Sequence, residues 1–501
     1  MLWFLLLLFL ITGTVLSWSL IYLILNSKFK DLFTSELQPH HTHVNQTARL
    51  GGIGIIFGMI ASFVLLWVLF KEHPQMSELT PYAILIGAIG CFLLGLVDDI
   101  KPVGAVFKFL MQILIAIFAH QCGLSIDHII LPFTDFDLDL SAFSLILTVI
   151  WFVSIINLMN LIDGLDGLAG GIGLMLMVLL VILGIDKNLP LSVFLAMGMA
   201  GAVLGFLIHN FPPARVYMGD SGAYTIGFMI AALSLMNFQK GAVVAALLGP
   251  MLAMALPIID VAFALVRRSI QGLPLFRPDK EHIHHQLIRS GISHKKTVLI
   301  LYGISLIALA GGILIFSNQG RYFPLFIGFS SVIVIFTFRM KQGQPFSLRK
   351  LFSESLEARY EVQNAVKLSK WFVSEVERVR VAEDQWSDYR WVLKKIGFQR
   401  VVLQVGSEQR IYESGKEAQD PFESASFKLD SLGAGSCIQF FGDKQLFTER
   451  RFNLVSDIAY ETWLIGCKKW MELNQSTYTF EGTATKHENA AIENARDLYM
   501  P

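Results

Sequence analysis

Long apolar runs constrain this chain more than any other feature, because they recur from the N-terminus to about residue 340. A helix needs about 20 apolar residues to cross the hydrocarbon core of a bilayer. Hydrophobic residues make up 54% of the chain and charged residues only 16%, against roughly a quarter in soluble proteins. We therefore expect an all-α polytopic membrane region with about eleven transmembrane helices. The expected spans are residues 1–26, 51–70, 82–97, 105–121, 142–160, 167–185, 191–209, 221–237, 242–263, 298–317 and 323–340.

The first apolar run predicts a membrane helix rather than a cleaved signal peptide. No basic segment precedes it, no small-residue cleavage site follows it, and Lys28 and Lys30 come directly after it. With the N-terminus outside, seventeen lysines and arginines fall on the cytoplasmic side and four in the outer loops. Because basic residues gather in cytoplasmic loops, this asymmetry favours an N-terminus outside the cell.

The composition changes near residue 341, where charged residues become dense and apolar runs shorten. We expect a membrane-embedded domain over 1–340, a small cytoplasmic α+β domain over 341–475, and a polar, disordered tail over 476–501. Within the second domain, apolar spacing predicts helices and strands. The expected elements are a helix at 353–385, strands at 399–405 and 436–441, and a helix at 450–472.

Charge balance and cysteine spacing exclude several other classes of protein. The 40 basic and 40 acidic residues give no net charge, so nothing favours a nucleic acid as a partner. The four cysteines are scattered without a CxxC pair, which argues against a disulfide framework or a zinc module.

Carboxylates are costly within membrane segments, so the placement of six aspartates is informative. The topology derived from the basic residues puts all six at the cytoplasmic ends of predicted helices. An inner loop with the sequence RPDKEHIHHQL adds three histidines. The residues concerned are Asp98, Asp99, Asp163, Asp166, Asp220 and Asp260, with His282, His284 and His285.

Acidic groups gathered at one membrane face need a neutralising cation, because they would otherwise repel one another. Oxygen ligands favour Mg²⁺ or Mn²⁺ over zinc, and Mg²⁺ usually binds through one or two carboxylates together with substrate phosphates. The residues alone therefore predict a metal-dependent enzyme that acts on phosphates at the inner face of the membrane.

The motifs differ in how specifically they indicate this chemistry. The segment NLMNLIDGLDGLAGG at 157–171 is the most specific, because carboxylates, amides and turn-forming glycines have little structural purpose together there. The pair Asp98 and Asp99 could instead be a solvated helix end. GDSG could simply cap a helix, and HIHH in isolation could bind zinc.

Five motifs occur in order: LGG at 50–52, DD at 98–99, NLMNLIDGLDGLAGG at 157–171, FPPARVYMGDSG at 211–222 and DKEHIHHQL at 279–287. This set resembles the polyprenyl-phosphate N-acetylhexosamine-1-phosphate transferases, of the glycosyltransferase family 4 type. The resemblance covers roughly residues 1–340. The HIHH form is similar to the branch that transfers GlcNAc-1-phosphate from UDP-GlcNAc, or a related UDP-HexNAc, to undecaprenyl phosphate, with release of UMP.

The resemblance implies the first membrane step of cell-surface polysaccharide synthesis at the bacterial cytoplasmic (inner) membrane, with the active site facing the cytoplasm. The branch that transfers MurNAc-pentapeptide phosphate carries three consecutive histidines and a phenylalanine, which are absent here. That donor, or another UDP-HexNAc, is the alternative. The resemblance is also compatible with a homodimer.

Roles of individual residues follow from the same resemblance. Asp220 is expected to be the principal ligand of Mg²⁺, for which Mn²⁺ could substitute. Asp98 and Asp99 are expected beside the metal and the lipid phosphate, one of them as base or nucleophile. Lys108, followed by Gln112, matches a phosphate-contacting lysine of the family. The expected substrate-binding residues are Lys108, Asn157, Asn160, Asp163, Asp166, Asn210, Tyr217, Arg277, His282, His284 and His285, with Asp166 and Tyr217 near the uracil.

Two features depart from the family pattern. No lysine lies between residues 31 and 49, where several relatives have one, so Thr47, Arg49 or a histidine is expected to replace it. The C-terminal domain lies outside the family core and is faintly similar to GAF-type sensory domains.

Alternatives remain for the mechanism and for the class of protein. We expect a direct in-line attack of the lipid phosphate on the donor, and a two-step route through an aspartyl-phosphate intermediate is the alternative. A transporter, or a sensor with a decayed transferase core, would also carry membrane carboxylates. Carboxylates confined to helix ends on one side, and a complete motif set, favour the enzyme.

Overall fold

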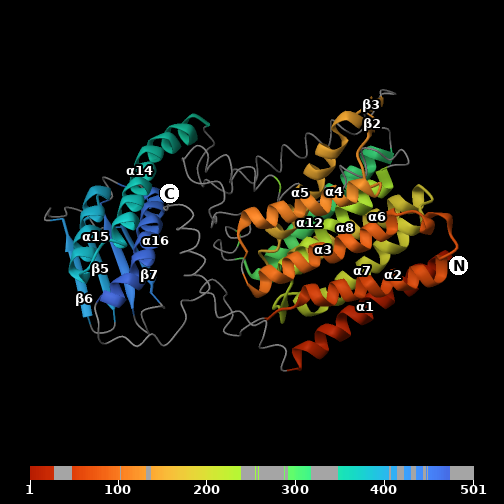
Figure 1. The fold of residues 1–501 in the computed structure, drawn as a ribbon, viewed down its shortest axis with the longest axis horizontal. Helices are drawn as coiled ribbons and strands as arrows, with labels where there is room; N and C mark the ends of the chain where they lie inside the picture. Colours follow the sequence, from red (N-terminus) through yellow and green to blue (C-terminus); the bar gives the residue numbers. More distant parts are fainter. Residues whose placement is uncertain are drawn as a thin grey trace. The chain divides into compact units, whose positions relative to one another are not determined.

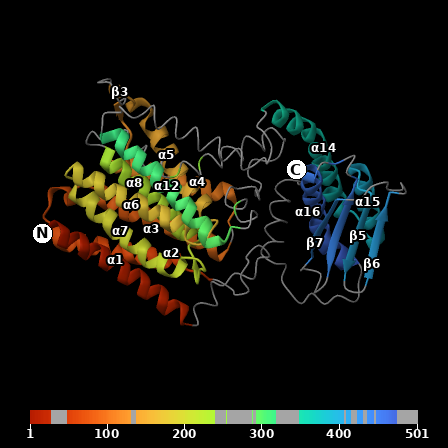
Figure 2. The ribbon, with the colours of Figure 1, turned by 180° about the vertical axis from the view of Figure 1, so that it is seen from behind.

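The computed structural model describes two compact units of the chain (Figures 1 and 2). One contains helices α1 to α8 and α12 with two short strand pairs, and the other contains helices α14 to α16 with strands β5 to β8. The described residues are 1–27, 48–101, 103–130, 137–238, 254, 258, 287, 292–317, 348–405, 408–414, 423–429, 436–443, 447 and 449–473.

The long apolar runs form the helices of the first unit. Proline occupies the first turn of α3 and of α7, where its missing N–H costs no hydrogen bond. The helices are α1 Leu2–Leu25, α2 Gly51–Phe70, α3 Thr80–Ile100, α4 Ala105–Gln121, α5 Ser144–Ile162, α6 Leu168–Asp186, α7 Pro190–Asn210, α8 Gly219–Phe238 and α12 His294–Ser317. The short strands are β1 Ala48–Arg49, β2 His128–Ile130, β3 Asp137–Asp139 and β4 Val216–Tyr217.

Within the described residues, six helices are long and apolar enough to cross a membrane, namely α1, α2, α3, α5, α6 and α7. The chain is therefore a multi-pass membrane protein, as the apolar runs predict. Helix α3 runs beyond the expected span of 82–97, and its last turn carries Asp98 and Asp99. The expected span 242–263 is described only at residues 254 and 258, and 323–340 lies outside the described residues, so eleven helices stays a prediction.

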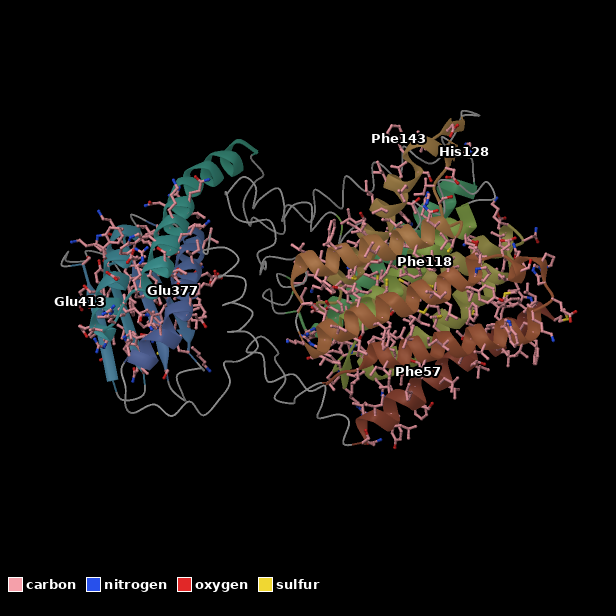
Figure 3. The ribbon with its side chains drawn as sticks, viewed as in Figure 1. Phe57, Phe118, His128, Phe143, Glu377 and Glu413 are labelled. Carbon is pink, nitrogen blue, oxygen red and sulfur yellow. The ribbon has the colours of Figure 1, made fainter. Side chains whose placement is uncertain are left out.

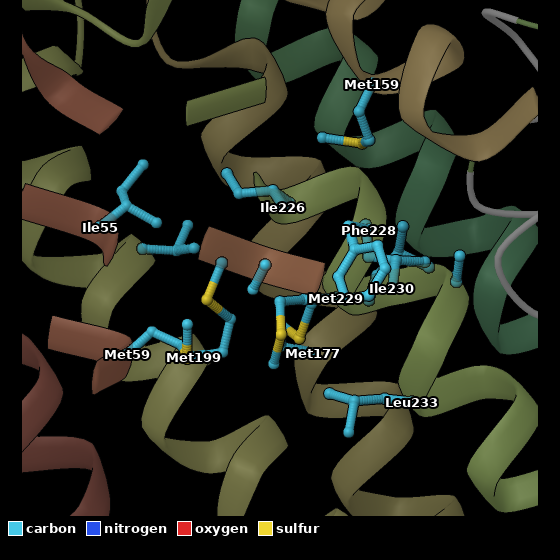
Figure 4. Close-up of a cluster of buried hydrophobic side chains, with 14 of the residues drawn as sticks. Ile55, Met59, Met159, Met177, Met199, Ile226, Phe228, Met229, Ile230 and Leu233 are labelled. Carbon is cyan, nitrogen blue, oxygen red and sulfur yellow. The ribbon is translucent and has the colours of Figure 1, made fainter. Parts of the chain in front are cut away.

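Helix α8 lies at the centre of this unit and packs against α2, α3, α5, α6 and α7. Side chains from residue 221 to residue 237 are all buried. Figure 4 shows Phe228, Met229 and Leu233 of α8 among methionines of neighbouring helices. Because protein rather than lipid surrounds it, α8 can carry Ser, Thr and Gly without exposing them to hydrocarbon.

Apolar side chains cover the outside of the bundle, as expected for a surface in contact with lipid. Phe57 of α2 is 53% exposed and Phe118 of α4 is 36% exposed, and Figure 3 shows both. Together with the apolar lengths of the helices, this surface is typical of a domain embedded in a bilayer.

The second unit contains a four-stranded antiparallel sheet of order β6–β5–β8–β7 and three helices. The prediction of a single helix at 353–385 is wrong, because one helix ends at residue 376 and the next begins at residue 382. Strands β6 and β7 were not expected, since EQRIYE and ESASFK are largely polar. The elements are α14 Leu348–Val376, α15 Ala382–Ile396, β5 Arg400–Val405, β6 Glu408–Glu413, β7 Glu423–Lys428, β8 Cys437–Gly442 and α16 Glu449–Leu473.

Candidate active site

Asp98, Lys108 and Asp220 meet at one end of the helix bundle, although they come from three different helices. The Lys108 Nζ lies 3.2 Å from Asp98 Oδ2 and 3.6 Å from Asp220 Oδ2. The backbone N–H of Val103 donates to the other oxygen of Asp98 at 2.9 Å. All three charged side chains are at most one quarter exposed. Limited exposure strengthens their mutual attraction relative to an ion pair in water.

Asp99 has a different set of partners from Asp98, because it caps the N-terminus of α8. Its Oδ1 accepts from the backbone N–H of Asp220 at 3.0 Å, and its Oδ2 accepts from the N–H and the hydroxyl of Ser221 at 3.0 and 2.7 Å. A carboxylate is favourable at a helix N-terminus, where backbone N–H groups lack helical partners. Asp99 therefore fixes the helix end from which Asp220 projects.

Two glycines allow α3 to approach the start of α8 this closely. A Cβ atom on Gly95 would lie 2.3 Å from the backbone nitrogen of Ser221, and one on Gly219 would lie 2.5 Å from Asp99 Oδ2. Gly219 also has a φ of +72°, which other residues rarely adopt. The GDSG motif thus begins with glycine because the Asp99 carboxylate occupies the space beside it.

Tyr224 holds the carboxylate of Asp220 from within the bundle. Its hydroxyl donates to Asp220 Oδ2 at 2.8 Å and accepts from the Asn160 Nδ2 at 3.2 Å. Tyr224 is four residues after Asp220 on α8, so both lie on one helix face. Tyr224 was not predicted from the sequence, although its spacing of four residues from Asp220 could have indicated it.

A second amide of α5 contacts α4. Asn157 Nδ2 donates to Gln112 Oε1 at 2.6 Å and to the Val153 carbonyl at 2.7 Å. Gln112 lies one turn after Lys108. The predicted residues Asn157 and Asn160 of α5 therefore both lie near the cluster of Asp98, Lys108 and Asp220.

The turn between α5 and α6 is tied to the segment before α8 by hydrogen bonds to backbone groups. Asp166 Oδ2 accepts from the Ala214 N–H at 3.1 Å. Asn210 accepts from the Gly167 N–H and donates to the Val216 carbonyl, both at 2.8 Å. These hydrogen bonds give Asp166 and Asn210 a role in shaping the loops of the site. Tyr302 of α12 adds a hydrogen bond from its hydroxyl to the Gly167 carbonyl.

Asp163 lies just beyond the end of α5 and faces the other carboxylates. Burial raises the pKa of Asp163 well above its ordinary value. The negative charges of Asp220 and Asp99 raise this pKa further, whereas Arg49 lowers it. Carboxylates gathered in this way favour the binding of a cation.

Arg49 reaches the site through a short parallel strand pair. Strand β1 pairs with β4, with Ala48 opposite Val216 and Arg49 opposite Tyr217. The pairing places Arg49 beside Tyr217. Arg49 is one of the residues expected to replace the missing lysine, and Tyr217 is the aromatic residue expected near the uracil. Arg277, His282, His284 and His285 lie outside the described residues.

The carboxylates fit a Mg²⁺ ion that is shared with a phosphate ligand. Within the described ranges, no three His, Cys, Asp or Glu side chains are grouped so as to hold a metal ion by themselves. Mg²⁺ usually needs only one or two carboxylates, with substrate phosphates and water completing its octahedron. Asp98 and Asp220 supply such a pair of carboxylates, with the Lys108 ammonium 3.2 Å and 3.6 Å from their Oδ2 atoms.

Fold and site together define a polytopic membrane protein with a charged, oxygen-rich site at one end of its helices. A family model for glycosyl transferase family 4 matches residues 81–237, which include Asp98, Lys108 and Asp220. The chain belongs to this family, that of the polyprenyl-phosphate N-acetylhexosamine-1-phosphate transferases.

Several curated proteins are similar to this chain. A probable undecaprenyl-phosphate N-acetylglucosaminyl 1-phosphate transferase of Bacillus subtilis is 34% identical over 301 residues, which cover 60% of this chain and 81% of the relative. A decaprenyl-phosphate N-acetylglucosaminephosphotransferase of Mycobacterium tuberculosis is 35% identical over 315 residues, or 55% and 74% of the two chains. An undecaprenyl-phosphate α-N-acetylglucosaminyl 1-phosphate transferase of Haemophilus influenzae is 26% identical over 306 residues, or 59% and 83%.

Proposed function

We propose that this protein transfers N-acetylglucosamine-1-phosphate from UDP-GlcNAc to undecaprenyl phosphate and releases UMP, with Mg²⁺ as cofactor. The observation that carries the proposal is the meeting of Asp98, Lys108 and Asp220 at the end of the buried helix α8. The names of the relatives support the acceptor lipid and the amino sugar. The asymmetry of basic residues supports an active site on the cytoplasmic face of the inner membrane.

In the proposed reaction, an oxygen of the lipid phosphate attacks the β-phosphorus of UDP-GlcNAc, which carries the sugar. The new P–O bond forms as the bond from the β-phosphorus to its bridging oxygen breaks, and UMP leaves with that oxygen. Mg²⁺, when bound, neutralises negative charge on the pyrophosphate. Lys108 supplies a fixed positive charge beside the reacting phosphates, and such positioning and electrostatics dominate phosphoryl transfer.

Of the two adjacent aspartates, Asp98 is our choice for the base that accepts the proton of the lipid phosphate. Both oxygens of Asp99 are engaged at the start of α8, whereas Asp98 faces Lys108 and Asp220. Asp99 is then a positioning residue, which holds the α8 terminus and thereby Asp220. Arg49 and Tyr217 are proposed to bind the uridine diphosphate group of the donor, because strands β1 and β4 bring them together.

The proposal is tested with purified protein in detergent, by following UMP release from UDP-GlcNAc. Release should require both undecaprenyl phosphate and Mg²⁺, and Asp220→Ala should lower the rate by orders of magnitude. Release with a different UDP-HexNAc only would change the donor and keep the reaction. No release with any UDP-sugar would refute the transferase.

A further inference from the structure

Gln112 carries a buried hydrogen-bond donor that no described residue satisfies. Its side chain lies within the membrane helix α4, and the residue is 1% exposed. Its Oε1 accepts from Asn157, but its Nε2 has no hydrogen-bond partner among the residues that the structure describes. A buried donor without an acceptor is unfavourable, so such a group in a polar site points to a ligand or to water.

The neighbouring amide fixes which way Gln112 points. Asn157 Nδ2 donates both to Gln112 Oε1 and to the Val153 carbonyl. Turning the Asn157 amide over would place its oxygen against the Val153 carbonyl, where two acceptors would repel. Gln112 must therefore present its oxygen to Asn157, which leaves its NH₂ group directed elsewhere.

This free NH₂ lies deeper in the helix bundle than the charged residues. Gln112 is four residues beyond Lys108 on α4, and therefore about 6 Å further along the same helix face. On α5, Asn157 is likewise one turn further from the site end than Asn160, which contacts Tyr224. Asn157 is exposed on a membrane helix, although an amide that faces only hydrocarbon is unfavourable. A polar ligand that arrives from the bilayer side would explain both amides.

We propose that the Gln112 NH₂ group, oriented by Asn157, donates to a phosphate oxygen of the acceptor lipid, so that the two amides form a polyprenyl-phosphate subsite beside Lys108. This inference deepens the proposed function and rests on it. A nucleotide sugar enters from the aqueous end, whereas the acceptor lipid comes from the membrane, to which Asn157 beside the buried Gln112 is exposed. A neutral donor also suits this depth, since a second lysine would carry an uncompensated charge into the bilayer.

Two variants separate the donor from the rest of the side chain. Gln112→Glu keeps the oxygen that Asn157 binds and replaces the NH₂ group by an oxygen that repels phosphate. Gln112→Met keeps the volume and removes both polar atoms. Because hydrogen bonds to charged groups are strong, Gln112→Glu should raise the KM for undecaprenyl phosphate about tenfold or more, with the KM for UDP-GlcNAc nearly unchanged. Gln112→Met should give a smaller increase of the same selectivity.

Ser192→Ala is the matched control, because it removes another buried hydrogen bond from the membrane helices. The Ser192 hydroxyl donates to Asn237 at 2.9 Å, at the start of α7 and thus far from Asn210 at the end of that helix. The control should leave both KM values unchanged. Equal changes in Ser192→Ala and the Gln112 variants would mean general destabilisation and would overturn the subsite.

Direct binding distinguishes this inference from the proposed function. Wild-type protein in nanodiscs should bind undecaprenyl phosphate more tightly than undecaprenol, and Gln112→Glu should reduce that preference about tenfold. Unchanged lipid constants in both Gln112 variants of an active enzyme would refute the subsite and leave the transferase standing. A wild-type protein that prefers the phosphate lipid but uses no UDP-sugar would refute the proposed function instead.

Discussion

The adjacent carboxylates Asp98 and Asp99 have different hydrogen-bond partners, and for this reason we propose different roles for them. Asp98 contacts a lysine side chain and one backbone N–H, whereas Asp99 accepts three hydrogen bonds from the start of α8. The same residue type, one position apart, is thus placed for chemistry in one case and for support in the other.

Amide substitutions at these two positions should therefore have different effects. Asp99→Asn places an NH₂ group against backbone donors, so it should cost about 1–3 kcal/mol of stability and lower the melting temperature. Asp98→Asn should cost less stability than Asp99→Asn, because Lys108 keeps Asp220 as a partner, and should reduce kcat by about 10²–10⁴. Thermal unfolding in detergent and turnover of both variants check this. Equal losses of stability would contradict the assignment.

A pH effect is expected at Asp127, which lies in a loop between α4 and α5. Burial alone would raise the pKa of Asp127, but hydrogen bonds from Ser125 and Ser144 outweigh it and lower that pKa. A carboxylate with a lowered pKa stabilises the folded state at pH values above its pKa in the unfolded chain, which is near 4 for Asp. This stabilisation disappears as the pH falls through the pKa of the folded state. Wild-type protein should therefore lose its stability advantage over Asp127→Asn below about pH 4. An advantage that persists there would contradict this account.

At the scale of elements, the site depends on the close contact between α3 and α8. Apolar runs predict the membrane helices well, because hydrocarbon requires a continuous helix. The expected span 82–97 is shorter than α3, but Asp98 and Asp99 lie at the end of that helix, as expected. In the second unit, burial on one face only allows polar strands such as β6, which an apolar pattern does not reveal.

Gly95→Ala tests the contact between these helices. Its Cβ atom would lie 2.3 Å from the Ser221 backbone, so the variant should cost about 1–3 kcal/mol of stability and most of the activity. Gly90→Ala is the matched control on the same helix, because its Cβ atom would meet only the Ile115 side chain at 3.4 Å. Unfolding temperatures and UMP release measure both variants. Equal behaviour of the two would show that the close approach is unimportant.

At the scale of the molecule, sequence reasoning identified the residues of the site better than their partners. Asp98 and Asp220 were predicted because each belongs to a motif at a helix end, and Lys108 because it matches a lysine of the family; the structure brings the three together. The contact of Tyr224 with Asp220 and the cap formed by Asp99 were not predictable. They depend on which faces of α3, α5 and α8 meet, and one sequence does not specify those contacts.

The orientation proposed from the basic residues can be tested by cysteine labelling. Asp186→Cys, at the end of α6, is expected outside, and Lys101→Cys, at the end of α3, is expected in the cytoplasm. In a Cys122→Ser and Cys437→Ser background, a membrane-impermeant maleimide should label the first in intact cells and the second only after permeabilisation. The reverse pattern would place the active site outside and contradict the proposed topology.

Transfer of the sugar together with its phosphate is tested most directly by following the β-phosphate of the donor. UDP-GlcNAc labelled with ³²P at that phosphate is incubated with the protein, Mg²⁺ and undecaprenyl phosphate, and the lipid is then extracted. The proposed sugar-phosphate transfer places the label in the lipid fraction, in equal amount to the UMP released, and Asp220→Ala abolishes both. Label that stays in water as UDP, while the sugar enters the lipid, would show transfer of the sugar alone and contradict the account.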